Sequence, residues 1–158
     1  MTPLERAVSY LTVRPRTRKQ VSEYLSEKGC SEEEVREVIK QLEEYNYIDD
    51  EEYTRMYFAR GFAKGHGEFR IKRELSQKGV DGNIIEDVIF DLREKDEVPD
   101  QFQIAMQIGL DMLGRENLAD MEYKERKKVE ARIGRRLMSR GFDSSTVYGV
   151  LRALEDRH

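Results

Sequence analysis

The sequence predicts an all-α protein made of three tandem three-helix, helix-turn-helix-like repeats that form an elongated, curved body. The first observation behind this prediction is composition: of 158 residues, 38% are charged and 38% are apolar. This apolar share is below the roughly 45–50% of ordinary globular domains, which disfavours one large core. The second is that residues 16–98 contain no proline, the main helix breaker. The third is a pattern that occurs three times along the chain.

The repeated pattern is built around a basic residue followed by glycine, at positions 28–29, 78–79 and 140–141. Apolar residues stand eight and four positions before each glycine, a helix-capping Ser or Asp stands two positions after it, and four apolar residues follow at helical spacing. In the order of the three copies, the apolar residues are Val21, Leu25, Val35, Val38, Ile39 and Leu42; Ile71, Leu75, Ile85, Val88, Ile89 and Leu92; and Ile133, Leu137, Val147, Val150, Leu151 and Leu154. Each copy therefore predicts a helix that ends at a glycine in the left-handed conformation, a short turn and a second capped helix.

A further helix precedes each of these pairs. In the first repeat, residues 1–48, Thr2-Pro3-Leu4-Glu5 is a capping box with proline at the first helical position, and residues 17–20 repeat the capping-box pattern. In the second repeat, residues 49–96, Asp49 or Asp50 caps the first helix. In the third repeat, residues 97–158, Pro99-Asp100 leads into the first helix.

The third repeat is longer than the other two. Successive glycines are 50 and then 62 residues apart, so the third repeat carries about a dozen extra positions. We expect them around residues 114–120, as a longer loop or an extended helix.

The residue inventory disfavours catalysis and metal binding. The only histidines are His66 and His158, and neither they nor the single Cys30 form a cluster at metal-ligand spacing. The glycine-rich segment 61–67 lacks the Gly-Lys-Ser/Thr ending of a phosphate loop and follows a helical pattern, so we interpret it as a helix–helix connection. We therefore predict that the chain is not an enzyme and has no catalytic residue, metal, cofactor or small-molecule substrate.

No apolar run approaches the ~18 residues that a membrane-spanning helix needs, and the N-terminus lacks the apolar stretch of a signal peptide. One cysteine cannot form a disulfide within the chain. The predicted protein is cytoplasmic, monomeric and without membrane contact.

Charge alternates strongly along the chain although its net value is only −4. Residues 23–52 carry −9 and residues 81–100 carry −6, whereas residues 55–78 carry +5 and residues 124–140 carry +6. In the last stretch eight cations face two anions along one predicted helix, which is more than solubility requires. We expect a functional basic surface formed by Arg60, Arg70, Lys72 and Arg73 together with Lys124, Lys127, Lys128, Arg132, Arg135 and Arg136.

A set of spaced residues along nearly the whole chain carries a family resemblance. Its members are Arg14-Pro15-Arg16, Tyr24-Leu25 before Lys28-Gly29, Tyr47-Ile48-Asp49-Asp50, Tyr53, Arg60, Gly67, Ile71, Glu74-Leu75, Lys78-Gly79-Val80 and Arg140-Gly141-Phe142. With these residues the chain resembles RecX, a family of bacterial regulatory proteins that modulate the recombinase RecA.

The resemblance implies three tandem three-helix repeats and a specific partner. Proteins similar to RecX bind along the helical groove of the RecA filament on single-stranded DNA. They lower the ATPase, strand-exchange and repressor-cleavage activities of RecA. The expected partner is therefore this filament, and the basic residues named above are expected to face RecA or DNA phosphates, with weak direct DNA contact.

The alternative is a sequence-nonspecific DNA-binding protein built from helix-turn-helix-like units. Local basic patches favour salt-sensitive binding to phosphates. Base-specific readout is disfavoured, because the helix in the recognition position of the first repeat carries Glu32, Glu33, Glu34, Glu37, Glu43 and Glu44. A purely structural scaffold, whose charges serve solubility, is a further possibility.

Overall fold

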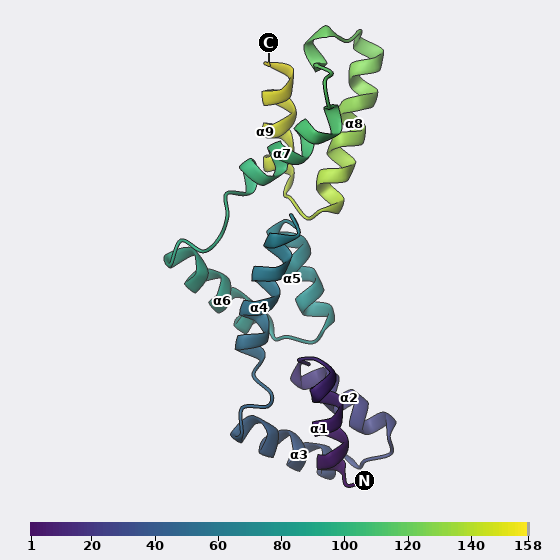
Figure 1. The fold of residues 1–158 in the computed structure, drawn as a ribbon, viewed down its shortest axis with the longest axis vertical. Coiled ribbons are helices and arrows are strands. Elements are labelled where there is room, and N and C mark those ends of the chain that lie inside the picture. Colours follow the sequence, from purple (N-terminus) through teal and green to yellow (C-terminus); the bar gives the residue numbers. More distant parts are fainter. Residues whose placement is uncertain (158) are drawn as a thin grey trace. The chain divides into compact units, whose positions relative to one another are not determined.

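The computed structural model describes residues 1–157, and helices are the only regular structure within them (Figure 1). This confirms the predicted all-α class. Nine α-helices are present in this range: α1 (Pro3–Val13), α2 (Arg18–Glu27), α3 (Glu32–Glu44), α4 (Asp50–Ala63), α5 (Glu68–Gln77), α6 (Gly82–Glu94), α7 (Gln101–Leu113), α8 (Tyr123–Ser139) and α9 (Ser144–Glu155). A 3-10 helix, η1 (Leu118–Asp120), lies between α7 and α8, where the extra residues of the third repeat were expected.

The chain forms two compact units. The first comprises residues 1–57 and 74–94, and the second comprises residues 58–73 and 95 onwards, so α4 and α5 contribute to both. In the first unit α1, α2 and α3 enclose a core of Ala7, Val21, Leu25, Val35, Val38, Ile39, Leu42 and Ile48. In the second unit α7, α8, α9 and η1 enclose a core of Ala105, Leu113, Leu118, Val129, Ile133, Leu137, Phe142, Val147, Val150 and Leu154. The repeat boundaries at residues 48 and 96 remain a proposal.

Side-chain caps define where the helices begin. Thr17 and Ser31 each form a full capping box, with Gln20 and Glu34 as the reciprocal partners. Of the two acids predicted as the cap of α4, Asp49 is the one that caps it. Its Oδ1 accepts a hydrogen bond from the N–H of Glu52 at 3.1 Å. The first backbone donors of these helices are therefore satisfied locally.

The three basic–glycine turns have the predicted backbone conformation. The φ angles of Gly29, Gly79 and Gly141 are 88°, 90° and 97°. In each turn the glycine N–H and the following N–H donate to carbonyls of the preceding helix, as in a Schellman motif; around Gly79, for example, the N–H of Val80 donates to the carbonyl of Leu75 at 3.1 Å. The repeated sequence pattern therefore encodes one repeated helix ending.

In the first unit, the start of α2 contacts the turn at the end of α5. The hydroxyl of the fully buried Thr17 donates to the carbonyl of Lys78 at 2.7 Å. The carboxylate of Asp50, at the start of α4, accepts from the N–H of Arg18 at 2.9 Å. Lys19 packs its side chain against Gly79. Gly79 thus ends α5 and also provides the surface on which the start of α2 packs.

The same contact recurs in the second unit, between the start of α5 and the turn at the end of α8. The N–H of Gly67 donates to the carbonyl of Arg140 at 2.7 Å, and the N–H of Phe69 donates to the carbonyl of Gly141 at 3.1 Å. The side-chain oxygen of Gln101, at the start of α7, accepts from the N–H of Glu68 at 3.0 Å. Here glycine stands where the first contact has Thr17, which lets the two backbones come closer.

Asp50 offers a test of this contact through its ionisation. Burial raises the pKa of the Asp50 carboxyl above its ordinary value of 3.8. The hydrogen bond from the Arg18 N–H lowers this pKa, but by less than burial raises it. Because the folded pKa is the higher one, ionised Asp50 lowers stability near neutral pH, and this cost disappears as the pH falls through the folded pKa.

Asp50→Asn keeps the acceptor oxygen without the charge. In urea unfolding we expect it to equal or exceed the wild type in stability at neutral pH, and to lose any advantage once the pH falls below 3.8, the ordinary pKa of the carboxyl. Asp50→Ala removes the acceptor and is expected to cost about 1 kcal/mol at both pH values. An Asn variant less stable than the wild type at neutral pH would contradict this account.

The connection expected at residues 61–67 is shorter than the sequence suggested. Helix α4 continues through Ala63, so only residues 64–67 connect it to α5. The reason is tertiary: Ile71 of α5 packs directly on Gly61, where an added Cβ would come within 2.6 Å of its Cδ1. Gly61 is therefore a packing position inside a helix.

Candidate functional site

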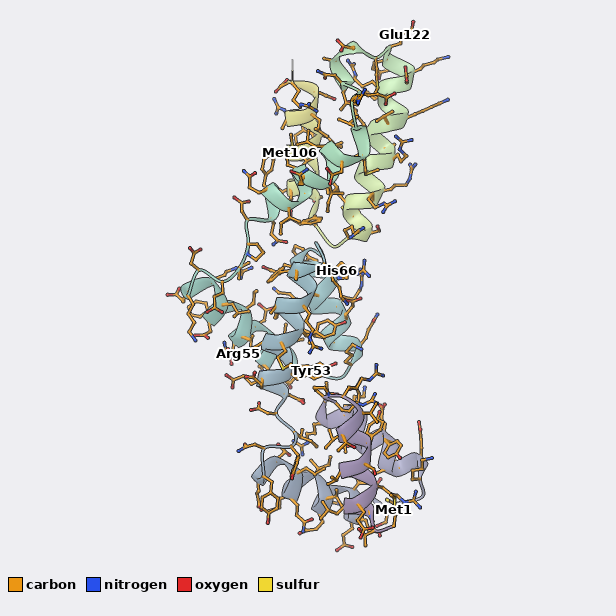
Figure 2. The ribbon with its side chains drawn as sticks, in the orientation of Figure 1. Met1, Tyr53, Arg55, His66, Met106 and Glu122 are labelled. Carbon is orange, nitrogen blue, oxygen red and sulfur yellow. The ribbon has the colours of Figure 1, made fainter. Side chains whose placement is uncertain are left out.

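Helix α8 separates an apolar face from a basic one, as predicted. Val129, Ile133 and Leu137 are buried in the core of the second unit. The rest of its surface carries six exposed cations, which we call the α8 basic face: Lys124, Lys127, Lys128, Arg132, Arg135 and Arg136. Glu122, labelled in Figure 2, precedes the first residue of this helix.

The α8 basic face is only weakly neutralised by nearby acids. Lys127 has an ion pair, with its Nζ 3.3 Å from Oε2 of Glu130. Within residues 1–157, no carboxylate lies within 4.0 Å of the charged nitrogens of Lys124, Lys128, Arg132, Arg135 or Arg136. These five charges are therefore available to an anionic partner.

Glu130 is an acid of the α8 interior rather than of the basic face. It is only 8% exposed, and its Oε1 lies 3.8 Å from Nε of Arg126. Burial raises the pKa of its carboxyl, the neighbouring Glu155 of α9 raises it further, and Lys127 opposes both effects. Glu130 therefore stays within the α8–α9 contact and does not cancel the outer charges.

The four cations predicted on α4 and α5 have different surroundings. Arg60 and Arg73 are exposed. Lys72 is half-buried, with its Nζ 3.1 Å from Oε2 of Glu68, and the backbone of Arg70 packs on the glycine of the Arg140–Gly141 turn. All ten predicted residues lie in the second unit. The contact between this turn and the start of α5 joins the two basic stretches within that unit.

Arg55 and Tyr53, labelled on α4 in Figure 2, belong to the first unit and make internal contacts. The guanidinium of Arg55 lies 2.6 Å from the Asp91 carboxylate of α6. This basic residue of the 55–78 stretch therefore ties α4 to α6.

A groove between α8 and α9 was not anticipated from the sequence. Its apolar lining, which we call the groove floor, consists of Ala131, Gly134, Met138, Val147 and Leu151, and its volume is about 560 Å³. Its charged lining residues are Lys127 and Arg135 of the α8 basic face and the acid Glu130. The signal for it was a glycine in the middle of a predicted helix, where glycine normally costs stability.

Gly134 is not required by the packing of the fold. An added Cβ would lie 3.8 Å from Cγ1 of Val147 and 3.9 Å from Cδ1 of Leu151, which are ordinary contacts. Since alanine is the better helix former, Gly134→Ala is expected to raise the free energy of unfolding by about 0.5–1 kcal/mol. Thermal and urea unfolding measure this, and a clear destabilisation would mean that the groove is closed more tightly than the structure indicates.

Neither a metal site nor a membrane span is found in the described part of the chain. Residues 1–157 contain no group of three or more His, Cys, Asp or Glu side chains placed to hold a metal ion. In the same range, no helix combines the length and the apolar character needed to cross a bilayer.

Known proteins resemble this chain both in sequence and in fold. Residues 4–42 match the model of the first three-helix domain of RecX, and residues 49–89 match that of the second. The regulatory protein RecX of Prosthecochloris aestuarii is 32% identical over 149 residues, which take in 94% of this chain and 90% of that protein. Those of Lactobacillus johnsonii and Clostridium perfringens are 30% and 28% identical.

The chain spans only 49% and 62% of the length of the last two relatives. Among solved structures, that of RecX from Lactobacillus salivarius superposes with a TM-score of 0.76 and 25% identity, over 97% of this chain and 94% of that one. A second crystal structure of regulatory protein RecX gives a TM-score of 0.70 at 25% identity, over 96% of this chain and 70% of that one. On two family-model matches, a relative matched over 90% of its length and the shared fold, the chain belongs to the RecX family of regulatory proteins.

Proposed function

We propose that this chain is a negative modulator of the RecA recombinase that binds along the groove of the RecA filament on single-stranded DNA. Bound there, it lowers ATPase, strand-exchange and repressor-cleavage activity. It acts as a monomeric binding protein in the cytoplasm, without catalysis of its own. The observation that carries this proposal is the α8 basic face, where five exposed cations have no ion-pair partner among residues 1–157 of a chain with a net charge of −4.

Charge concentrated on one helix supports a binding role over a role in solubility. Unpaired exposed cations repel one another, and a surface that served only solubility would intersperse both signs. Opposite charges across an interface speed association and select the partner. A nucleoprotein filament offers acidic protein surface and phosphates to such a face.

The modular construction supports a polymeric partner. The contact between the start of one helix and a basic–glycine turn is built twice, at Lys78–Gly79 and at Arg140–Gly141. Repeated modules can engage repeated sites on a polymer, and linked contacts add through effective concentration, so that each can be individually weak.

Direct, sequence-nonspecific DNA binding is the second candidate, since the same unpaired cations fit phosphates. The first turn of α3 argues against base readout by that helix, because it presents Glu32, Glu33 and Glu34. Negative side chains at this position would be repelled by the DNA backbone.

A binding titration distinguishes the two candidates. Fluorescently labelled chain is titrated with bare single-stranded DNA and with the same DNA coated by RecA, which is held assembled by a slowly hydrolysed ATP analogue. We expect affinity for the coated DNA to be higher by about tenfold or more, which corresponds to about 1.4 kcal/mol. Equal affinities for the two would favour direct DNA binding. ATPase inhibition, measured on the same samples, links binding to regulation.

A further inference from the structure

The groove between α8 and α9 combines an apolar floor with a basic rim. Ala131 and Met138 of α8 and Leu151 of α9 contribute apolar surface, and Met138 is 51% exposed. Lys127 and Arg135 are the two cations of the lining. Exposed apolar surface with a polar rim is typical of a site that a partner covers.

Gly134 leaves its part of the groove open, because it has no side chain to occupy it. Glycine in a helix interior costs about 1 kcal/mol relative to alanine. The neighbours of Gly134 leave normal contact distance for a Cβ, at 3.8 Å and 3.9 Å. Folding therefore gives no reason for glycine here, and a side chain longer than that of alanine would project into the groove.

The dimensions of the groove fit a helix. Its lining residues on α8 run from Lys127 to Met138 along one face, and the eleven steps between these two residues rise about 16 Å along the helix. That length matches three turns of a second helix, which would place apolar residues at i, i+3 or i+4, and i+7 against the floor.

Charge complementarity defines the chemistry of the partner. Lys127 and Arg135 line the groove, and Lys124 and Lys128 of the same basic face lie one turn from them or less. The acid in the lining, Glu130, is 8% exposed and is held by Lys127 and Arg126. A nucleic acid is the poorer occupant, because the groove lining contains no aromatic ring on which a base could stack.

We propose that the α8–α9 groove binds an amphipathic acidic helix of a protein partner, with its apolar residues on the groove floor and its carboxylates beside Arg135 and, at the Lys127 end of the groove, beside Lys124 and Lys128. The assignment of this helix to a subunit of the recombinase filament rests on the proposed function. The recognition chemistry rests on the groove alone.

A model peptide tests the recognition chemistry on the full chain. The probe is a synthetic helix of about fourteen residues, four turns, with Leu at the anchor positions and Glu elsewhere. We expect saturable changes in the amide NMR signals of Ala131, Gly134 and Leu151. A matched peptide with Lys in place of Glu is expected to bind about tenfold more weakly or worse. The absence of saturable changes, equal binding of both peptides, or displacement of the Glu peptide by a single-stranded oligonucleotide would overturn the proposal.

Two substitutions at one position separate filling of the groove from loss of the fold. Gly134→Leu places a side chain in the groove and is expected to weaken the Glu peptide about tenfold or more, whereas Gly134→Ala is expected to change its affinity less than about threefold. Ala131→Glu, at an exposed position of the groove floor, adds a charge that repels the Glu peptide. Its peptide affinity tests the proposal if the leucine variant does not fold. Unchanged peptide binding in a folded Gly134→Leu or Ala131→Glu variant would overturn the proposal.

Filament binding separates this inference from the proposed function. If the wild type binds the Glu peptide but not RecA-coated DNA, the proposed function is wrong, whereas the proposal that the groove binds an acidic amphipathic helix is retained. If the wild type binds the filament and Gly134→Leu binds it equally well, the assignment of the helix to the recombinase is overturned. A parallel loss of peptide and filament binding in Gly134→Leu, with Gly134→Ala unaffected, is the expected result.

Discussion

Replacement of Gly141 by alanine is expected to lower the free energy of unfolding by about 4 kcal/mol or more, among the largest losses for a single substitution. Gly141 has a φ of 97°, which an L residue adopts only with strain. Its Cβ would also lie 2.5 Å from the backbone nitrogen of Arg70 and 2.8 Å from its Cα. Backbone cannot move aside as a flexible side chain can, so the Arg140–Gly141 turn and the start of α5 would have to separate.

Gly29 and Gly79 provide matched controls, because they end their helices in the same way. Gly29 has a φ of 88° and nothing within 4 Å of an added Cβ, so Gly29→Ala is expected to cost about 1–2 kcal/mol from backbone strain alone. At Gly79 an added Cβ would lie 2.5 Å from the Cβ of Lys19, which is fixed to the backbone of α2, so Gly79→Ala is expected to cost more than Gly29→Ala.

Urea unfolding followed by circular dichroism gives the order of the three variants. The expected order of destabilisation is Gly141→Ala, then Gly79→Ala, then Gly29→Ala. Similar losses at Gly141 and Gly29 would show that the contact between the turn and α5 adds nothing to stability. Since the chain forms two units, the transition of each unit is fitted separately.

Reversal of three charges on the α8 basic face is expected to weaken inhibition of RecA ATPase about tenfold or more without loss of helicity. The variant is Lys124→Glu, Lys128→Glu and Arg135→Glu, at exposed positions that have no ion pair within residues 1–157. Each reversal replaces attraction by repulsion at an anionic partner. Because the three side chains lie outside the apolar core, the fold is expected to be retained.

A second triple reversal controls for the change in net charge. Arg36→Glu, Lys40→Glu and Arg115→Glu alter the net charge equally, at exposed positions of α3 and of the connection after α7. This control is expected to retain most inhibition, and the wild type is expected to lose affinity as salt is raised. Full inhibition by a folded α8 variant, or equal losses in both variants, would remove the α8 basic face from the mechanism.

The local structure of this protein was predictable from its sequence because its determinants are neighbours in the chain. Thr17 and Ser31 cap helices through residues three positions away. The three basic–glycine turns are closed by hydrogen bonds that reach back five residues or fewer, as at Val80 and Leu75. Apolar spacing correctly placed Val129, Ile133 and Leu137 of α8 in the core. The exposure of the α8 basic face follows from the same helical geometry.

Other features depend on contacts between residues far apart in the chain, which spacing does not reveal. Asp50 caps α2 rather than its own helix, through a hydrogen bond to Arg18, 32 positions earlier. Gly61 belongs to α4 because Ile71 packs on it. The groove depends on how the side of α8 that bears Gly134 faces Val147 and Leu151 of α9.

The composition and repeat pattern of the chain were therefore sufficient for its helices, their caps, their glycine endings and the location of its positive charge, since each of these arises within a few turns of backbone. Which charges are engaged in ion pairs, which glycines permit close packing and where a partner finds an apolar groove emerged once distant segments were packed together. Packing depends on which residues are close in space, and the spacing of residues along the sequence does not give that proximity.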